Sequence, residues 1–426
     1  MSKNISDRSN STDYDLDPST PYPGLFAFQE KDKDYFFGRE KEINELFDRI
    51  KDNVLTIVLG KSGIGKTSLL QAGLIPKLRV NFYLPIYIKS RFDGADEINP
   101  LTQIKTIIEK EIQKLDKSAP FFKNLTLWEY FHKVQILDGL VKPLLLFDQF
   151  EEIFKIGKQT PERINPLIVE IGDLVQDWIP VKVQEKYKNE SILYSDENPT
   201  YRVVFSLRED YLAHLRNFYR YMPSAVDGIY HYRVSQMKGK DAINAVLKPG
   251  KDIIKDDEVA VEIIEKIPES QDADYIPYEK QNGSWESKKI EPFLLCLFCY
   301  QVNEKRMTAK ADKVALELLR DVTVKDIVKD YYEEVINQFK PSMKIAIEEH
   351  LLTPEGDRKL QDTNSIKKEY NIQEDDIEKL VDKRIIRKER RNNIDYIELI
   401  HDVLALILKE IRDKRRAEEK LKEKNR

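Results

Sequence analysis

The chain has 426 residues, of which 41% are hydrophobic, so it suggests two or three domains with sizeable cores and excludes global disorder. Charged residues reach 34% and nearly balance to a formal net charge of -5, which disfavours a general nucleic-acid binder with its basic excess. The two cysteines, Cys296 and Cys299, exclude a disulfide framework and favour a reducing compartment.

The sequence also predicts a cytoplasmic location. The N-terminus is polar and lacks the apolar stretch of a signal peptide. The longest apolar run, residues 293–300, is shorter than the ~18 residues needed to cross a bilayer. We therefore expect no membrane span.

In chain order, the first half of the sequence predicts strands separated by helices. Residues 1–20 are polar and expected to be disordered, and PYPGL at 21–25 opens an ordered leading segment. Short apolar runs that alternate with helix-period stretches are typical of βαβ units and a parallel sheet. The predicted strands are 54–59, 82–88, 144–147 and 202–207, with 230–234 as a candidate fifth, and the predicted helical regions are 43–50, 66–78, 98–137 and 148–178.

After residue 250 the apolar positions follow helical spacing. The last folded part mixes helices with two short strands, 385–387 and 396–399, flanking a polar turn, which suggests a winged helix. The predicted fold is thus an α/β P-loop NTPase core with a parallel sheet, then a helical domain and a winged-helix domain. The expected boundaries are a disordered N-terminus at 1–20, leading segment and NTPase domain at 21–250, helical domain at 251–340, winged-helix domain at 341–411, and a charged helical tail or linker at 412–426.

Residues 60–67, GKSGIGKT, match the P-loop pattern in full. Glycines let successive backbone N–H groups point at phosphate oxygens, and the following helix adds its positive end. Lys66 is expected to reach the β- and γ-phosphates of ATP or ADP, and the Thr67 hydroxyl to bind Mg²⁺. The alternative, a glycine-rich turn without a ligand, is disfavoured because the match lies between an apolar strand and an amphipathic helix. The loop residues predicted to bind nucleotide are Gly60, Ser62, Gly63, Ile64, Gly65, Lys66, Thr67 and Ser68.

Asp148 follows the buried strand 144–147, about eighty residues after the loop. Because the carboxyl ends of parallel strands share one edge of the sheet, this acid is expected to face the P-loop and to hold Mg²⁺ through water. The alternative is a charged strand-end residue that caps the next helix.

Three further charged residues complete the predicted catalytic set of Lys66, Asp148, Glu151, Glu152 and Arg208. Glu151 or Glu152 would orient or deprotonate the attacking water, or else both are first-turn helix acids. Arg208 ends the strand 202–207, where it would stabilise charge on the γ-phosphate, or else form a salt bridge to Glu209 or Asp210.

With these residues placed, the chain resembles the STAND-class signal-transduction ATPases, specifically the bacterial novel STAND group. The resemblance covers residues 21–411 and rests on ordered short motifs. These are PYPGL at 21–25, FFGRE at 36–40, the P-loop, LFDQFEE at 146–152, SLRED at 206–210, IEPFLL at 290–295 and LIHD at 399–402.

The resemblance implies an ATP/ADP switch. ADP would hold a closed monomer, and ATP with a trigger would permit homo-oligomerisation and signalling in antiviral defence or regulated cell death. It also implies that Arg39, Pro249 and His401 contact the nucleotide, Pro249 near the base and His401 at the β-phosphate in the closed state. Without the family, His401 is simply a histidine before an apolar helix.

The sequence departs from the family pattern in two respects. Gln149 stands where many relatives carry a second acid, so the water-activating role moves to Glu151 or Glu152, or hydrolysis is slow. Neither an effector nor a sensor repeat array is recognisable, so we expect a separately encoded effector or sensor partner, or a missing domain.

Two other interpretations stay open. A nucleotide-bound scaffold that does not hydrolyse would fit Gln149 and the missing effector. A DNA-associated ATPase would use the basic turn Arg390-Arg391, but the acidic composition favours a solvated turn. Cys296 and Cys299 have zinc-knuckle spacing without a second pair, so they are interpreted as core residues.

Overall fold

The computed structural model describes residues 15–24, 26–61, 63–90, 99–187, 199–268, 284–391, 394–400 and 402–424. The chain forms two compact units, which are described separately. The N-terminal unit is Ala27–Gln236, and the C-terminal unit joins Met1–Phe26 to Met237–Arg426.

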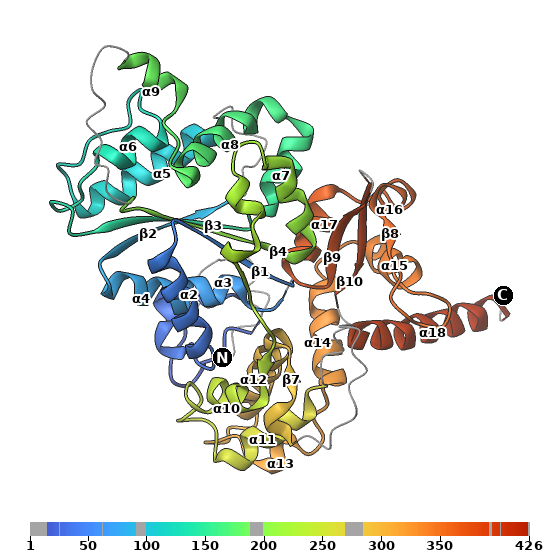
Figure 1. Cartoon of the computed structure of the whole chain (residues 1–426). Helices are drawn as coiled ribbons and strands as arrows, with labels where there is room; N and C mark the ends of the chain where they lie inside the picture. The colour runs from blue at the N-terminus through green and yellow to red at the C-terminus, as the bar shows by residue number, and fades with distance from the viewer. Residues whose placement is uncertain are drawn as a thin grey trace. The chain divides into compact units, whose positions relative to one another are not determined.

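The N-terminal unit is built on a five-stranded parallel sheet in the order β2-β3-β4-β1-β5 (Figure 1). All five predicted strands are present, including the candidate fifth. β4 lies between β1 and β3, so the chain segments that leave β1 and β3 flank the end of β4. The strands are β1 (Leu55–Gly60), β2 (Tyr83–Lys89), β3 (Lys142–Asp148), β4 (Arg202–Arg208) and β5 (His231–Arg233).

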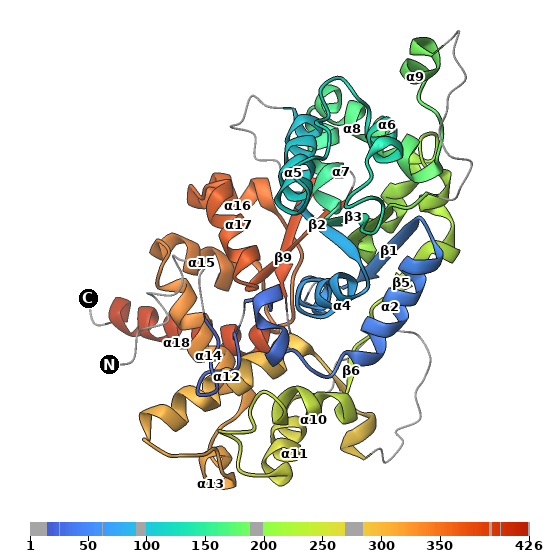
Figure 2. The same cartoon turned by 90° about the vertical axis from the view of Figure 1, so that its left-hand side faces the viewer.

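Helices cover both faces of this sheet, as Figures 1 and 2 show for α2, α3 and α4 on one face and α5, α6 and α8 on the other. Successive residues of a strand point to opposite faces of the sheet. Ile57 packs toward α5 and α8, and Val58 packs toward α2 and the helix that starts at α3. The helical elements are η1 (Glu30–Tyr35), α2 (Glu40–Asp52), α3 (Lys66–Ser68), η2 (Leu69–Leu74), α4 (Ile75–Val80), α5 (Pro100–Leu115), α6 (Leu127–Lys133), α7 (Glu151–Gln159), α8 (Pro161–Gln176), α9 (Val181–Lys186), η3 (Glu209–Phe218), η4 (Pro223–Val226) and η5 (Gly228–Tyr230).

The predicted helix 66–78 is continuous but not uniform, since a π-helical turn, η2, separates α3 from α4. Within it the N–H of Ile75 donates to the carbonyl of Leu70, five residues earlier. Pro76 has no N–H to continue the α-helical pattern, and the wider turn just before it accommodates this missing donor.

Two glycines of this unit give a matched test of helix packing. A Cβ on Gly172 of α8 would lie 2.5 Å from the carbonyl oxygen of Tyr221, whereas a Cβ on Gly157 of α7 would meet Ile164 at an ordinary 3.6 Å. Gly172→Ala is expected to destabilise the protein by about 1–3 kcal/mol because a backbone must shift. Gly157→Ala is expected to stabilise it by up to about 1 kcal/mol through helix propensity. Urea unfolding curves measure both, and equal effects would contradict the packing at Gly172.

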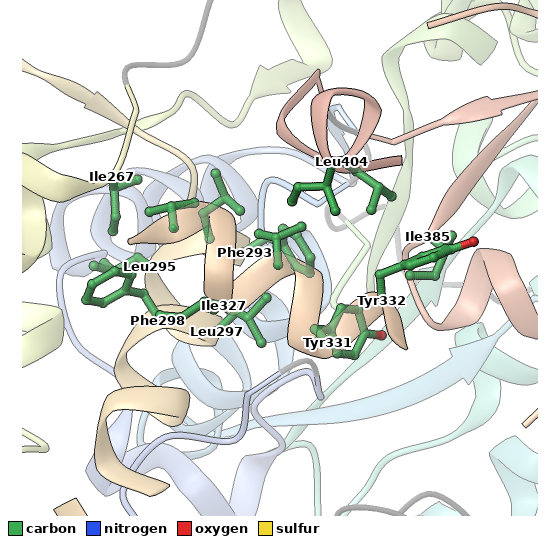
Figure 3. Close-up of a cluster of buried hydrophobic side chains, with 14 of the residues drawn as sticks. Ile267, Phe293, Leu295, Leu297, Phe298, Ile327, Tyr331, Tyr332, Ile385 and Leu404 are labelled. Carbon is green, nitrogen blue, oxygen red and sulfur yellow. The ribbon is translucent and has the colours of Figure 1, made fainter. Parts of the chain in front are cut away.

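The C-terminal unit is mainly helical and has one continuous hydrophobic core. Figure 3 shows part of it, where Phe293, Leu297 and Tyr332 lie among aliphatic side chains from several helices. The elements of this unit are β6 (Met237–Lys238), α10 (Gly239–Leu247), α11 (Asp257–Lys266), η6 (Trp285–Ser287), β7 (Lys289–Ile290), α12 (Pro292–Thr308), α13 (Leu316–Leu319), α14 (Val324–Ile336), α15 (Pro341–His350), β8 (Gln361–Asp362), α16 (Thr363–Tyr370), α17 (Glu374–Asp382), β9 (Ile386–Arg391), β10 (Ile394–Leu399) and α18 (Asp402–Lys424).

The boundary between the units differs from the expected one at residue 250. β6 pairs with β7, and the buried Tyr22 hydroxyl donates to the carbonyl of Val246 in α10 at 2.6 Å. The carbonyl of Ser19 likewise accepts from Asn303 of α12 at 2.8 Å, inside the segment expected to be disordered. The first described residues and α10 therefore belong to the C-terminal unit, a grouping that long-range contacts create and local sequence does not reveal.

The end of the C-terminal unit contains the predicted pair of short strands. β9 and β10 form an antiparallel hairpin, and β8 adds a third strand beside β10. The hairpin follows the helices α15, α16 and α17. The assignment of this region as a winged helix stays a prediction.

The charged tail is part of the long helix α18, which packs on α14 and α15. Arg415 of α18 forms an ion pair with the buried Glu348 of α15 at 2.9 Å. Cys299 lies in the hydrophobic core of this unit, Cys296 packs against that core, and burial raises the pKa of Cys296 to about 12. Among the described helices, none is both long and apolar enough to cross a membrane.

Candidate nucleotide-binding site

The P-loop runs from the end of β1 to the start of α3. Gly63 and Gly65 have φ of +82° and +91°, left-handed values that other residues adopt only with strain. The loop therefore turns its backbone sharply before the first helical turn, as the phosphate-binding pattern requires. Ser62 lies outside the described residues.

Lys66 is held inside this loop. Its Nζ donates to the carbonyl oxygens of Gly60 at 2.7 Å and of Lys61 at 3.0 Å. Burial lowers the pKa of the Lys66 ammonium, while the negative charges of Glu151 and Asp148 oppose that shift. A phosphate group would supply the opposite charge that this partly desolvated ammonium favours.

Thr67 and Asp148, 81 residues apart, meet as the sequence analysis expected. The Thr67 hydroxyl donates to Oδ2 of Asp148 at 2.8 Å, and Asp148 is only 1% exposed. A hydroxyl and one carboxylate fit Mg²⁺, which takes oxygen ligands and is commonly completed by water and substrate phosphates. No group of three or more His, Cys, Asp and Glu side chains within the described part of the chain could hold a metal alone.

Asp148 has a second hydroxyl partner that the sequence analysis missed. The hydroxyl of Tyr87, near the end of β2, donates to the same Oδ2 at 2.8 Å. The backbone N–H of Gln149 donates to Oδ1 at 3.0 Å. The sequence gives only a weak signal for Tyr87, which is a residue with a hydroxyl group near the end of a predicted strand. The sequence does not reveal that this strand lies beside the strand that ends at Asp148.

Glu151 and Glu152 both lie in the first turn of α7 but differ in their surroundings. Glu151 is buried and accepts from the backbone N–H of Arg208 at 3.3 Å, whereas Glu152 is partly exposed. Burial raises the pKa of Glu151, and the nearby charge of Lys66 opposes that shift. Glu151 thus lies at the end of β4, where the charge of Lys66 acts on it, and its role at the phosphates stays a prediction.

Gln149 explains how these groups come together. Its φ is +57°, a left-handed turn directly after β3, and the next residue, Phe150, donates its N–H to the carbonyl of Ser206 on β4 at 2.8 Å. The turn therefore starts α7 against the end of β4. Ser206 also has a fully buried hydroxyl without a hydrogen-bond partner in the described structure.

Arg208 forms the salt bridge that was its alternative interpretation. Its Nε and Nη2 donate to the two carboxylate oxygens of Asp210 at 3.0 and 2.7 Å, and its guanidinium lies 5.5 Å from the centre of the Tyr211 ring. A role of Arg208 at the γ-phosphate stays a prediction.

Arg39 and Ser68 connect the leading segment to the P-loop. The guanidinium of Arg39, 3% exposed, donates to the carbonyls of Ile64 at 3.2 Å and Ser235 at 2.8 Å, and pairs with Glu42. Ser68 Oγ accepts from the backbone N–H of Phe28 at 3.1 Å. These contacts fix the loop backbone, and direct contact of Arg39 with nucleotide stays a prediction.

Two predicted residues remain, Pro249 and His401. Pro249 follows α10 in the C-terminal unit, and His401 lies outside the described residues. Their roles at the nucleotide stay predictions.

A glycine loop between β1 and α3, with a lysine inside it and a strand-end aspartate bonded to its threonine, defines a P-loop NTPase. The chain belongs to the Novel STAND NTPase 1 family, whose model matches residues 21–425. The predicted family and the predicted α/β P-loop core followed by a helical region are both confirmed.

No curated protein matches this sequence, whereas several solved structures do. The Walker-type ATPase PABY2304 of Pyrococcus abyssi is 14% identical over 90% of this chain and 97% of that one, with a TM-score of 0.43. The Aeropyrum pernix ORC2 protein, in ADPNP-ADP complexes, is 13% identical over 96% and 98%, with a TM-score of 0.44. Cdc6p from Pyrobaculum aerophilum is 13% identical over 94% and 99%, with a TM-score of 0.40.

Proposed function

We propose that this protein is a nucleotide-controlled switch that binds ATP and ADP with Mg²⁺ and hydrolyses ATP slowly. The observation that carries the proposal is the hydrogen bond from Thr67 of the P-loop to Asp148 at 2.8 Å, beside the loop-bound Lys66. Bound Mg²⁺ would neutralise charge on the β- and γ-phosphates. Lys66 would bind phosphate oxygens, and Thr67 and Asp148 would hold the metal and its water.

Slow hydrolysis follows from the residues after Asp148. Gln149 cannot accept a proton, so activation of water falls to Glu151, a buried acid that acts on the charge of Lys66 and accepts from the N–H of Arg208 at the end of β4. A carboxylate held by the backbone N–H of Arg208 has less freedom to approach a water than an exposed one. Slow hydrolysis would keep the ATP-bound state of the switch populated for a long time.

The signalling role of the switch is proposed from the family to which the chain belongs. In the closed form ADP would be contacted by Arg39, Pro249 and His401, and the helices and hairpin of residues 341–411 would act as a winged helix. ATP would replace ADP and permit homo-oligomers that signal to an effector or sensor partner in the cytoplasm, in antiviral defence or regulated cell death.

The nucleotide carried through purification tests the proposal. Acid extraction and ion-exchange chromatography are expected to find ADP in the wild-type protein and none in Lys66→Ala. Adding ATP with Mg²⁺ is then expected to increase the mass measured by light scattering after gel filtration. Wild-type protein that carries no nucleotide and stays a monomer with ATP would contradict the switch.

A non-hydrolysing scaffold is the second candidate, and the observation in its favour is Gln149 directly after Asp148. Phosphate release separates the two. Retained nucleotide without any phosphate release by the wild-type protein would favour the scaffold.

A further inference from the structure

The carboxylate of Asp148 is nearly saturated with hydrogen-bond donors. An ionised carboxylate offers about four acceptor positions, two on each oxygen. Thr67 and Tyr87 both donate to Oδ2 at 2.8 Å, and the N–H of Gln149 donates to Oδ1 at 3.0 Å. As far as the described residues go, one acceptor position is left, and it is on Oδ1.

Tyr87 reaches Asp148 because of the sheet register. Lys89 of β2 is opposite Asp148 of β3, so Tyr87 lies two residues back on the neighbouring strand, a diagonal distance that a long aromatic side chain can span. Tyr83 and Tyr87 both pack on the sheet face that carries Leu144, Leu146 and the P-loop helix. The hydroxyl of Tyr87 thus arrives on the same face as Thr67.

The hydroxyl of Tyr87 is a permanent donor at neutral pH. An ordinary phenol has a pKa of about 10, so it is protonated and able to donate at this pH. A protonated phenol beside a carboxylate donates a charge-assisted hydrogen bond, which is stronger than a neutral one and fixes the orientation of the acceptor.

We propose that Tyr87 is a positioning residue for the metal–phosphate site, because it fills the second acceptor position of Oδ2 and leaves Oδ1 to a metal-bound water. The inference rests on the nucleotide binding proposed above. Thr67 can keep its hydrogen bond to Oδ2 while its own lone pair faces the metal, since donating and accepting use different parts of the hydroxyl. Without Tyr87 the carboxylate has two open positions and less rotational restraint.

The expected consequence is specific to the metal. In Tyr87→Phe the ring stays and only the hydroxyl is lost, so the P-loop and Lys66 should bind ADP alone as before. The Mg²⁺ concentration that gives half of the metal-dependent gain in ADP affinity should rise by roughly tenfold, as expected for loss of one hydrogen bond to a charged group.

The experiment uses the full-length chain and a fluorescent ADP analogue, titrated in EDTA and at increasing MgCl₂. Tyr83→Phe is the matched control, since Tyr83 lies on the same strand and face but packs its ring against Phe47, 6.4 Å between ring centres, at the other end of β2. A raised Mg²⁺ requirement in Tyr87→Phe alone, with affinity in EDTA within about twofold of wild type, supports the inference.

Two results would overturn it. An unchanged Mg²⁺ requirement in Tyr87→Phe would do so, as would an equal loss of affinity with and without Mg²⁺, which is the mark of a purely structural role. Failure of the proposed function looks different, because the wild-type protein itself would then bind no ADP in either buffer.

Discussion

Lys66→Ala is expected to abolish tight nucleotide binding, with a loss of affinity of roughly 100-fold or more. The wild-type ammonium lies inside the P-loop, on the carbonyls of Gly60 and Lys61, where it can contact phosphate oxygens. Hydrogen bonds to charged groups contribute about 1.5–3 kcal/mol each, so losing the expected bonds from the ammonium to the phosphate oxygens gives a loss of this size. Isothermal titration calorimetry with ADP measures it directly.

The matched control is Lys61→Ala, which removes an exposed lysine from the same loop. Its affinity is expected to stay within roughly threefold of wild type, because an exposed charge makes small contributions. Unchanged affinity in Lys66→Ala, with wild-type melting behaviour, would overturn the assignment of this loop as the phosphate site.

Glu151→Gln is expected to lower ATP hydrolysis by about 10²–10⁴-fold while ATP binding changes little, because a positioned general base contributes a factor of this size. Glutamine keeps the length and the acceptor oxygen that bonds to the N–H of Arg208 but cannot take a proton. Single-turnover phosphate release and a separate binding titration distinguish the two effects.

Glu152→Gln provides the control on the same helical turn, where the side chain is only partly buried. A loss below roughly tenfold is expected there, from a weakened charge near the site. If Glu152→Gln loses hydrolysis and Glu151→Gln keeps it, the assignment of the two acids is reversed and the proposal for Glu151 fails.

The pH dependence of hydrolysis gives Glu151 a second readout. Burial raises its pKa, and only the carboxylate form can accept a proton, so the rate should fall with decreasing pH at a higher pH than for an ordinary glutamate. The effect of Glu151 on the stability of the fold changes with pH in the opposite direction. Because the pKa of Glu151 is raised in the folded state, the folded protein loses stability as the pH rises above the pKa that Glu151 has in the unfolded chain. Glu151→Gln should remove this loss of stability at neutral pH.

Local sequence was sufficient for the strands and for the loop. Apolar runs such as 144–147 predicted β3, because a strand covered on both faces must be apolar throughout. The spacing of Gly60 to Thr67 predicted the phosphate loop, because its chemistry lies within eight consecutive residues. Asp148 could be predicted from its place at the end of a parallel strand, and its bond to Thr67 agrees with that argument.

The helix that follows the P-loop shows a limit of local reasoning. Helical periodicity predicted one helix over 66–78, whereas the structure interrupts it with the π turn of η2. Pro76 was visible in the sequence, but the adjustment upstream of it depends on packing: a Cβ at Gly73 would lie 2.8 Å from the side chain of Ile43 of α2. The helical periodicity of residues 66–78 does not reveal the close approach of Gly73 to Ile43.

The sequence by itself determined the class of protein, the strands, the phosphate loop and the acid that faces it, since each depends on neighbouring residues in the chain. Only the tertiary structure decided that β4 separates β1 from β3, that Tyr87 bonds to Asp148, and that Arg39 holds the carbonyl of Ile64. It also decided that Tyr22 belongs with α10 rather than with the P-loop unit. These features depend on which strand or helix lies beside which, and strand order and register follow from the packing of the whole sheet rather than from any local pattern.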